Sequence, residues 1–103
     1  MSAAIRVDGN DGRLLLSGVL DARTGPDLRE QGGALIRGSQ LPAVSLDLSA
    51  VQKSSSVGLA LLLAFMRDAE AAGKTLLVRA LPEDMRQIAE VCQLLDLLPA
   101  SAA

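Results

Sequence analysis

Three consecutive serines, Ser54 to Ser56, are the residues of this chain best placed to do chemistry. They precede an apolar run, Gly58 to Met66, that has no charged or strongly polar side chain. Serine oxygens commonly accept hydrogen bonds from the unpaired N–H groups at the start of a helix. A phosphate or an acidic group of a partner is also electrostatically favoured there. The pattern therefore predicts either a plain helix cap or a hydroxyl that contacts a partner.

The sequence does not support a catalytic role for these serines. The chain has no histidine, and no lysine lies at a Ser-x-x-Lys spacing from them. Cys92, the single cysteine, also lacks a histidine to activate it, and we expect it on an apolar helix face in a reducing compartment. The glycines do not form a phosphate-binding loop, and the aspartates are not spaced as a calcium loop. We therefore expect a protein that is not an enzyme and holds no metal or cofactor.

Composition indicates one globular domain spanning residues 1–103. Half of the residues are hydrophobic, yet Phe65 is the only aromatic one, and the net charge is −2. A chain without basic patches or stacking aromatics is not expected to bind nucleic acid. The N-terminus does not resemble a signal peptide, and the longest apolar run is about half of a membrane span. We expect a cytoplasmic protein without a direct membrane span.

Periodicity and turn residues predict the order β-β-α-β-α-β-α, a mixed β-sheet covered by helices. The 44–48 and 74–80 strands, joined through a helix, are expected to be parallel. The predicted elements are strands at Ala4–Val7 and Arg13–Leu20 around the loop Asp8–Gly12, a helix from Thr24 to about Arg37, a strand at 44–48, a helix ending near Gly73, a strand at Lys74–Ala80, a helix opened by Pro82, and a frayed tail at Pro99–Ala103.

Several residues carry specific expectations within these elements. Thr24 is predicted to cap the first helix. Gly32 and Gly33 weaken that helix by about 1 kcal/mol each relative to alanine, so it should be mobile or closely packed there. Asp47 is expected to fix the loop that follows its strand. Residues at helical spacing should face inward on the last helix, namely Met85, Ile88, Ala89, Cys92 and Leu95.

The central helix has more apolar surface than one sheet face needs. Five apolar side chains share one side at 100° per residue, namely Leu59, Leu62, Leu63, Met66 and Ala69. Leu61 and Phe65 project from the other side, next to the serines. Another helix could cover them, but we favour a surface exposed to a partner. The predicted partner-binding residues are Ser54, Ser55, Ser56, Val57, Gly58, Leu61 and Phe65, with Ser54 or Ser55 as the helix cap.

The segment DLSAVQKSSSVGLALLL, from Asp47 to Leu63, resembles the STAS domain, a family named for sulfate transporters and anti-sigma-factor antagonists. In that family a strand ending Asp-Leu/Phe-Ser leads to Asp-Ser/Thr-Ser/Gly-Gly-Leu at the start of the central helix. Ser56 falls at the family's phosphorylatable or partner-contacting position. Ser55 replaces an aspartate, and Val57 replaces a small residue. Leu14 to Asp21 (LLLSGVLD) is typical of the family's second strand.

The resemblance implies two alternative functions. The Gly58–Leu63 run is most similar to small cytoplasmic subunits of ABC systems that move phospholipid and maintain outer-membrane asymmetry. This implies a partner that is an ABC ATPase subunit, and through it an inner-membrane complex. The alternative is an anti-sigma-factor antagonist switched by phosphorylation of Ser56. The missing acid at Ser55 disfavours kinase regulation more than it disfavours docking.

Overall fold

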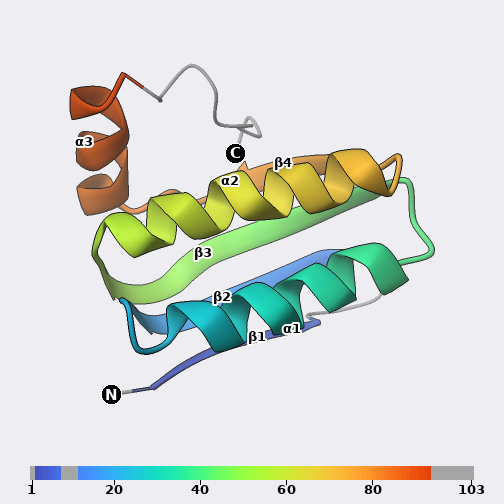
Figure 1. Ribbon diagram of the computed structural model, residues 1–103, viewed down its shortest axis with the longest axis horizontal. Coiled ribbons are helices and arrows are strands. Elements are labelled where there is room, and N and C mark those ends of the chain that lie inside the picture. Colours follow the sequence, from blue (N-terminus) through green and yellow to red (C-terminus); the bar gives the residue numbers. More distant parts are fainter. Residues whose placement is uncertain (1, 8–11, 94–103) are drawn as a thin grey trace.

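The computed structural model describes residues 2–7 and 12–93 (Figure 1). Their elements follow the predicted order β-β-α-β-α-β-α. The bounds are β1 Ala3–Val7, β2 Arg13–Leu20, α1 Gly25–Gly38, β3 Ala43–Ser54, α2 Ser56–Ala71, β4 Thr75–Arg79 and α3 Glu83–Val91. The predicted α/β fold class is therefore confirmed. The loop residues 8–11, Leu95 and the tail Pro99–Ala103 lie outside the described residues.

The four strands form one mixed sheet in the order β1-β2-β3-β4. β1 runs antiparallel to β2, with Ile5 opposite Leu16. β2, β3 and β4 are parallel, and Leu46 lies opposite Leu14 on one side and Val78 on the other. The predicted parallel pairing of the third and fourth strands is confirmed. Because these strands are parallel, their carboxyl ends meet at one edge of the sheet, where α1, α2 and α3 begin (Figure 1).

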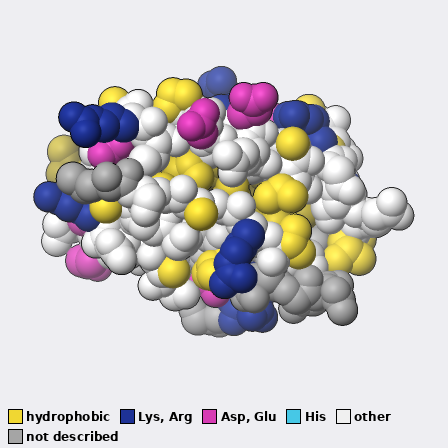
Figure 2. All heavy atoms as spheres, turned by 90° about the horizontal axis from the view of Figure 1, so that it is seen from below, with side chains coloured by type: hydrophobic (Ala, Val, Ile, Leu, Met, Phe, Trp, Pro, Cys, Tyr) yellow, Lys and Arg dark blue, Asp and Glu magenta, His cyan; other side chains and the backbone are white. Residues whose placement is uncertain are grey.

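Helices α1 and α2 lie side by side on the same face of the sheet, and α3 stands at the end where α2 begins (Figure 1). The core lies between the helix pair and the sheet, and side chains such as Leu16, Leu46 and Leu62 are fully buried there. On the face drawn in Figure 2, hydrophobic side chains lie in small groups among basic and acidic ones.

The expectation that Leu61 and Phe65 are exposed is wrong. Phe65 is 0% exposed and Leu61 is 4% exposed, because α1 covers the flank of α2 that carries them. The close approach depends on Gly32, where an added Cβ would lie 2.5 Å from Phe65 Cε1 and Cζ. Of the two outcomes expected for the glycines of this helix, the structure shows close packing.

β3 extends from Ala43 to Ser54 and is longer than the predicted strand at 44–48. The clean alternation of buried and half-exposed residues ends after Leu48. Pairing with β2 nevertheless continues as far as Leu20 opposite Ser54, with two shifts in the β2–β3 register. The longer strand delivers the three serines directly onto the start of α2.

Two predictions about single side chains are also wrong. Thr24 is the residue before α1, but its hydroxyl donates to Val19 O at 2.8 Å and accepts from Asp21 N, so it does not cap the helix. Cys92 is exposed rather than part of an apolar face. α3 ends at Val91, and Gln93 has a positive φ of 58°, so the helical spacing that would bury Cys92 stops too early. Met85 and Ala89 are buried as predicted, and Ile88 is half-buried.

Candidate partner-binding site

The three serines at the β3–α2 junction have three different environments. Ser54 is buried, and its N–H donates to Asp84 Oδ2 at 3.1 Å. Ser55 is the helix cap, because its Oγ accepts the N–H of Val57 at 3.2 Å. Its own N–H donates to Leu20 O at 2.9 Å, which ties the cap to the end of β2. One of the two serines predicted as caps is thereby confirmed.

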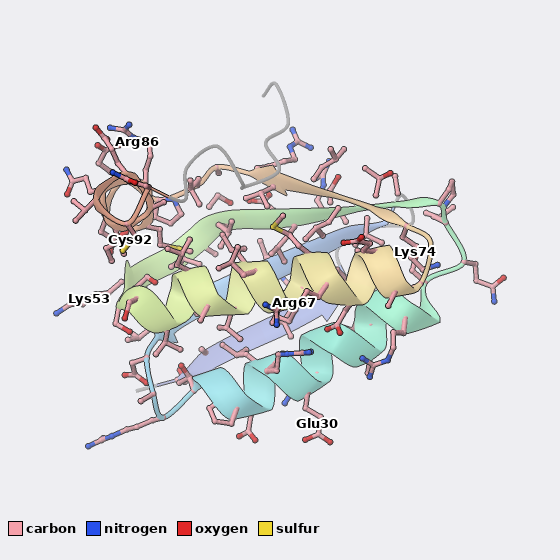
Figure 3. All side chains as sticks on the ribbon, turned by 45° about the horizontal axis from the view of Figure 1, so that its top comes forward. Glu30, Lys53, Arg67, Lys74, Arg86 and Cys92 are labelled. Carbon is pink, nitrogen blue, oxygen red and sulfur yellow. The ribbon has the colours of Figure 1, made fainter. Side chains whose placement is uncertain are left out.

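Ser56 is the exposed first residue of α2. Within residues 2–7 and 12–93, its hydroxyl forms no hydrogen bond. Because Ser55 already caps the helix, the Ser56 hydroxyl is available to solvent or to a partner. It also lies at the positive end of the α2 dipole, where an anionic group is favoured. Figure 3 shows Lys53, two residues before the cap, extending from the same end of the molecule into solvent.

Val57 and Gly58 hold the junction against the rest of the fold. The half-buried Val57 packs on Gly25 of α1, where an added Cβ would lie 2.8 Å from Val57 Cγ1. An added Cβ on Gly58 would lie 2.0 Å from Ser54 Oγ and 3.2 Å from Met85 Cε. Gly58 has no side chain to present to a partner, and the half-buried Val57 presents only part of its own. Their role is to position Ser56 and the neighbouring surface.

An apolar groove of about 340 Å³ runs between the first turns of α1 and α2, beside the serine cap. Its small side chains leave a shallow concave surface, to which the nearly buried Leu61 contributes. We define the two-helix groove by its lining residues, Ala22, Gly25, Pro26, Arg29, Val57, Ala60 and Leu61. Sequence reasoning missed the α1 half of it. The only sequence signal for this half of the groove was a set of small residues before and within the first turn of α1, namely Ala22, Gly25 and Pro26.

Asp21 organises the turn that leads into the groove. Its Oδ1 accepts the N–H of Arg23 at 2.9 Å and the N–H of Thr24 at 3.2 Å. These hydrogen bonds, more than the nearby Arg23 charge, hold the pKa of Asp21 below its ordinary value. The turn fixes where Ala22 and Gly25 lie. Its signal in the sequence was an aspartate three residues before a threonine, a common turn pattern.

A second pocket, of about 380 Å³, lies at the opposite end of α1, between Leu35, Leu41 and Val44. It is remote from the serines and is not part of the candidate site. Within the described ranges, no group of three or more His, Cys, Asp or Glu side chains could hold a metal ion. No helix of that part of the chain is long and apolar enough to cross a membrane.

Solved structures of anti-sigma-factor antagonists share this architecture. An antagonist from Mycobacterium paratuberculosis is 28% identical, with a TM-score of 0.74 over 99% of this chain and 87% of that one. The unphosphorylated form of SpoIIAA is 16% identical, with a TM-score of 0.69 over 99% of this chain and 89% of that one. The phosphorylated Bacillus SpoIIAA is 16% identical, with a TM-score of 0.66 over 98% and 92%. At 16% identity, the two SpoIIAA structures show similarity of fold alone.

The fold and the serine-capped central helix thus define a STAS domain, the class expected from the sequence. More narrowly, the chain belongs to the family described as "Mlab, STAS domain", which matches residues 3–99. The predicted resemblance is confirmed. No curated protein sequence matches the chain.

Proposed function

We propose that this chain is a non-enzymatic subunit that binds and supports the ATPase of a phospholipid-transporting ABC complex. The observation that carries the proposal is the match of residues 3–99 to the MlaB family. The resemblance of the sequence to that family implies an ABC ATPase as its partner. The geometry supplies a surface for it, an exposed Ser56 beside an apolar groove. In this proposal the chain is cytoplasmic and reaches the inner membrane only through the complex.

The docking surface that we propose is narrower than the predicted one. Ser56 and Val57 remain in it, joined by the exposed Ala60 and Pro26 of the two-helix groove. Ser54, Ser55 and Gly58 support the surface from beneath or cap the helix, and no partner contact is assigned to them. Leu61 and Phe65 are removed as exposed anchors because they are buried against α1.

Substitutions of Ser56 test the proposal in a pull-down with the ATPase subunit from the same organism. Ser56→Glu should abolish binding, because a bulky charge would occupy the contact surface. It should leave the melting temperature nearly unchanged, because a carboxylate suits a helix N-terminus. Gln40→Glu adds the same charge at an exposed position at the other end of α1 and should bind normally. Wild-type binding by the Ser56→Glu protein would remove Ser56 from the interface.

The neighbouring serine provides a test that separates capping from docking. Ser55→Ala should lower the free energy of unfolding by about 1 kcal/mol, because Val57 N–H loses its acceptor. Ser56→Ala should change it by less than about 0.5 kcal/mol, because its hydroxyl is exposed. Urea titrations of both variants measure the difference. Equal losses would contradict the assignment of Ser55 as the cap.

One observation favours an anti-sigma-factor antagonist as the second candidate. The exposed Ser56 hydroxyl is accessible to a kinase, and the 28% identical Mycobacterium structure is an anti-sigma-factor antagonist. Affinity purification from the native host separates the two functions. Recovery of a serine kinase with phosphate on Ser56, and without an ABC ATPase, would support the antagonist. Recovery of the ATPase with unmodified Ser56 would support the transport subunit.

A further inference from the structure

One arginine lines the two-helix groove and a second lies further along the exposed side of α2, on a chain whose net charge is −2. Arg29 of α1 is one of its lining residues. Arg67 lies about two turns after Ala60 and therefore on the same outer face of α2. Figure 3 shows Arg67 on this outer side of the helix. Arg29 and Arg67 thus place basic side chains in and beyond the groove, on a chain whose net charge is negative.

The nearest acid does not neutralise these basic side chains. Asp68 is paired with Arg29, whose Nη2 lies 3.3 Å from Oδ1, and with Arg37, whose Nη1 lies 3.7 Å from the same oxygen. The Asp68 side chain is only 12% exposed, whereas the Arg29 and Arg37 side chains are 43% and 56% exposed. The carboxylate therefore lies beneath the two guanidinium groups. One acid holds two cations and leaves an excess of positive charge at the surface.

Arg67 adds a third positive charge to the outer surface of the helix pair, after Arg29 and Arg37. It forms no ion pair with the described residues. Glu70 lies one turn further along α2, but its position on the helix places it on the side away from α1. Glu30 projects from α1 away from α2 (Figure 3). The outer surface of the helix pair thus combines an apolar groove with basic side chains.

We propose that the groove binds a segment of the ATPase partner that places small apolar side chains in the groove and carboxylates against Arg29 and Arg67. This inference rests on the proposed function and names the chemistry of the partner at that site. Apolar contacts at the centre of such an interface provide most of the affinity, while bordering charge pairs raise the association rate and fix the register. The groove of about 340 Å³ has room for few side chains, so the charge pairs matter for specificity.

Charge reversal at Arg67 tests the inference by calorimetric titration of the purified ATPase subunit with this chain. Arg67→Glu should weaken binding about tenfold or more, because a carboxylate would then face the partner's acids. Arg6→Glu makes the same charge change on the exposed β1 and should bind as the wild type does. Raising NaCl from about 50 mM to about 300 mM should weaken wild-type binding and have less effect on Arg67→Glu. Exchanging one acidic residue of the partner for arginine should restore binding to Arg67→Glu.

A second variant tests the apolar part of the site. Ala60→Glu puts a carboxylate at the exposed edge of the groove and should weaken binding at least as much as Arg67→Glu. Circular dichroism melting of each variant checks that the fold is retained.

If the wild type binds the ATPase and both variants bind it as tightly as the wild type does, the groove proposal fails and the proposed function stands. If the wild type does not bind the ATPase, both fail. Binding to anionic phospholipid vesicles that Arg67→Glu abolishes, with ATPase binding unchanged, would assign the arginines to lipid and overturn the inference.

Discussion

At the scale of single residues, glycines decide how closely the two helices approach. Gly32 faces the Phe65 ring, and Gly33 lies under the Asp68 carboxylate, where an added Cβ would be 2.8 Å from Oδ2. Gly38, in the same helix, has no atom within 4 Å of its would-be Cβ. Each glycine costs the helix a similar propensity penalty, but Gly32 and Gly33, unlike Gly38, compensate for it by admitting a neighbour.

Alanine substitutions at two of these glycines should therefore have opposite effects. Gly32→Ala should lower the free energy of unfolding by about 1–3 kcal/mol, because the buried Phe65 ring cannot move without disturbing the core. Gly38→Ala should leave it unchanged or raise it by up to about 1 kcal/mol, because the unfolded chain loses freedom. Urea denaturation of the two variants measures the effect. A stabilised Gly32→Ala protein would show that the helices are not in close contact.

Asp47 gives the stability a pH dependence that can be measured. Its Oδ1 accepts the N–H of Ser49 at 2.8 Å, but Ser49 lies inside β3, so the expectation that Asp47 fixes a loop after its strand is wrong. This hydrogen bond, with smaller contributions from Arg13 and Arg79, holds its pKa below the ordinary aspartate value of 3.8. The stabilisation is therefore present above pH 3.8 and is lost as the pH falls through the lower folded-state pKa.

Comparison with Asp47→Asn isolates this contribution. The variant should be less stable than the wild type at pH 5–7, because the amide cannot carry the charge that the hydrogen bond and the arginines favour. The gap should shrink as the pH falls below the ordinary value of 3.8. Urea titrations of both proteins across this range provide the measurement. A gap that stays constant down to full protonation would show that the folded-state pKa is not lowered.

At the scale of elements, α2 is buried on two sides rather than one. Its sheet side carries residues such as Leu62 and Ala69, and its second side carries Leu61 and Phe65 against α1. The exposed residues of α2 are Ser56, Ala60 and Arg67 on its outer strip and Glu70 and Ala71 in its last turn. The unusual apolar content of this helix is thus explained by its central position between sheet, α1 and α3.

Substitutions along α2 should follow this division. Phe65→Ala should cost about 3–5 kcal/mol, and Leu61→Asp should unfold the isolated chain, because each acts in the core. Arg67→Ala, on the outer strip, should change the free energy of unfolding by less than about 0.5 kcal/mol. Circular dichroism melting of the three variants checks the division. A folded Leu61→Asp protein would place Leu61 at the surface and contradict the packing of α1 on α2.

At the scale of the whole molecule, three distant segments meet at the carboxyl edge of the parallel strands. Ser55 N–H donates to Leu20 O at the end of β2, and Ser54 N–H donates to Asp84 at the start of α3. The proposed docking surface is therefore tied to both neighbours in the fold. These two hydrogen bonds make it difficult for this edge of the sheet to unfold separately from the core.

The chain should consequently unfold in a single cooperative transition. One core formed by one sheet and the helix pair, with the edge tied to it, leaves no independent unit among the described residues. The usual comparison of circular dichroism with intrinsic fluorescence cannot test this, because the chain lacks the tryptophan and tyrosine that give the fluorescence signal. Calorimetric and van't Hoff enthalpies should therefore be compared. A van't Hoff enthalpy well below the calorimetric one would reveal separately unfolding parts.

The sequence by itself determined the order of the elements, the mixed sheet, the family, and that Ser54 or Ser55 caps the central helix. These features depend on local signals, such as the alternation from Val44 to Leu48 and the serines before Gly58. Only the tertiary structure decided which side of α2 is exposed, how far β3 extends, and that Cys92 lies outside the core. A helical wheel gives the angle between Leu61 and Leu62 but not the neighbour that covers each, because α1 reaches Leu61 and Phe65 from a distant part of the chain. The sequence could not predict the α1 half of the groove for the same reason. It exists only where Gly25 and Val57 are brought into contact.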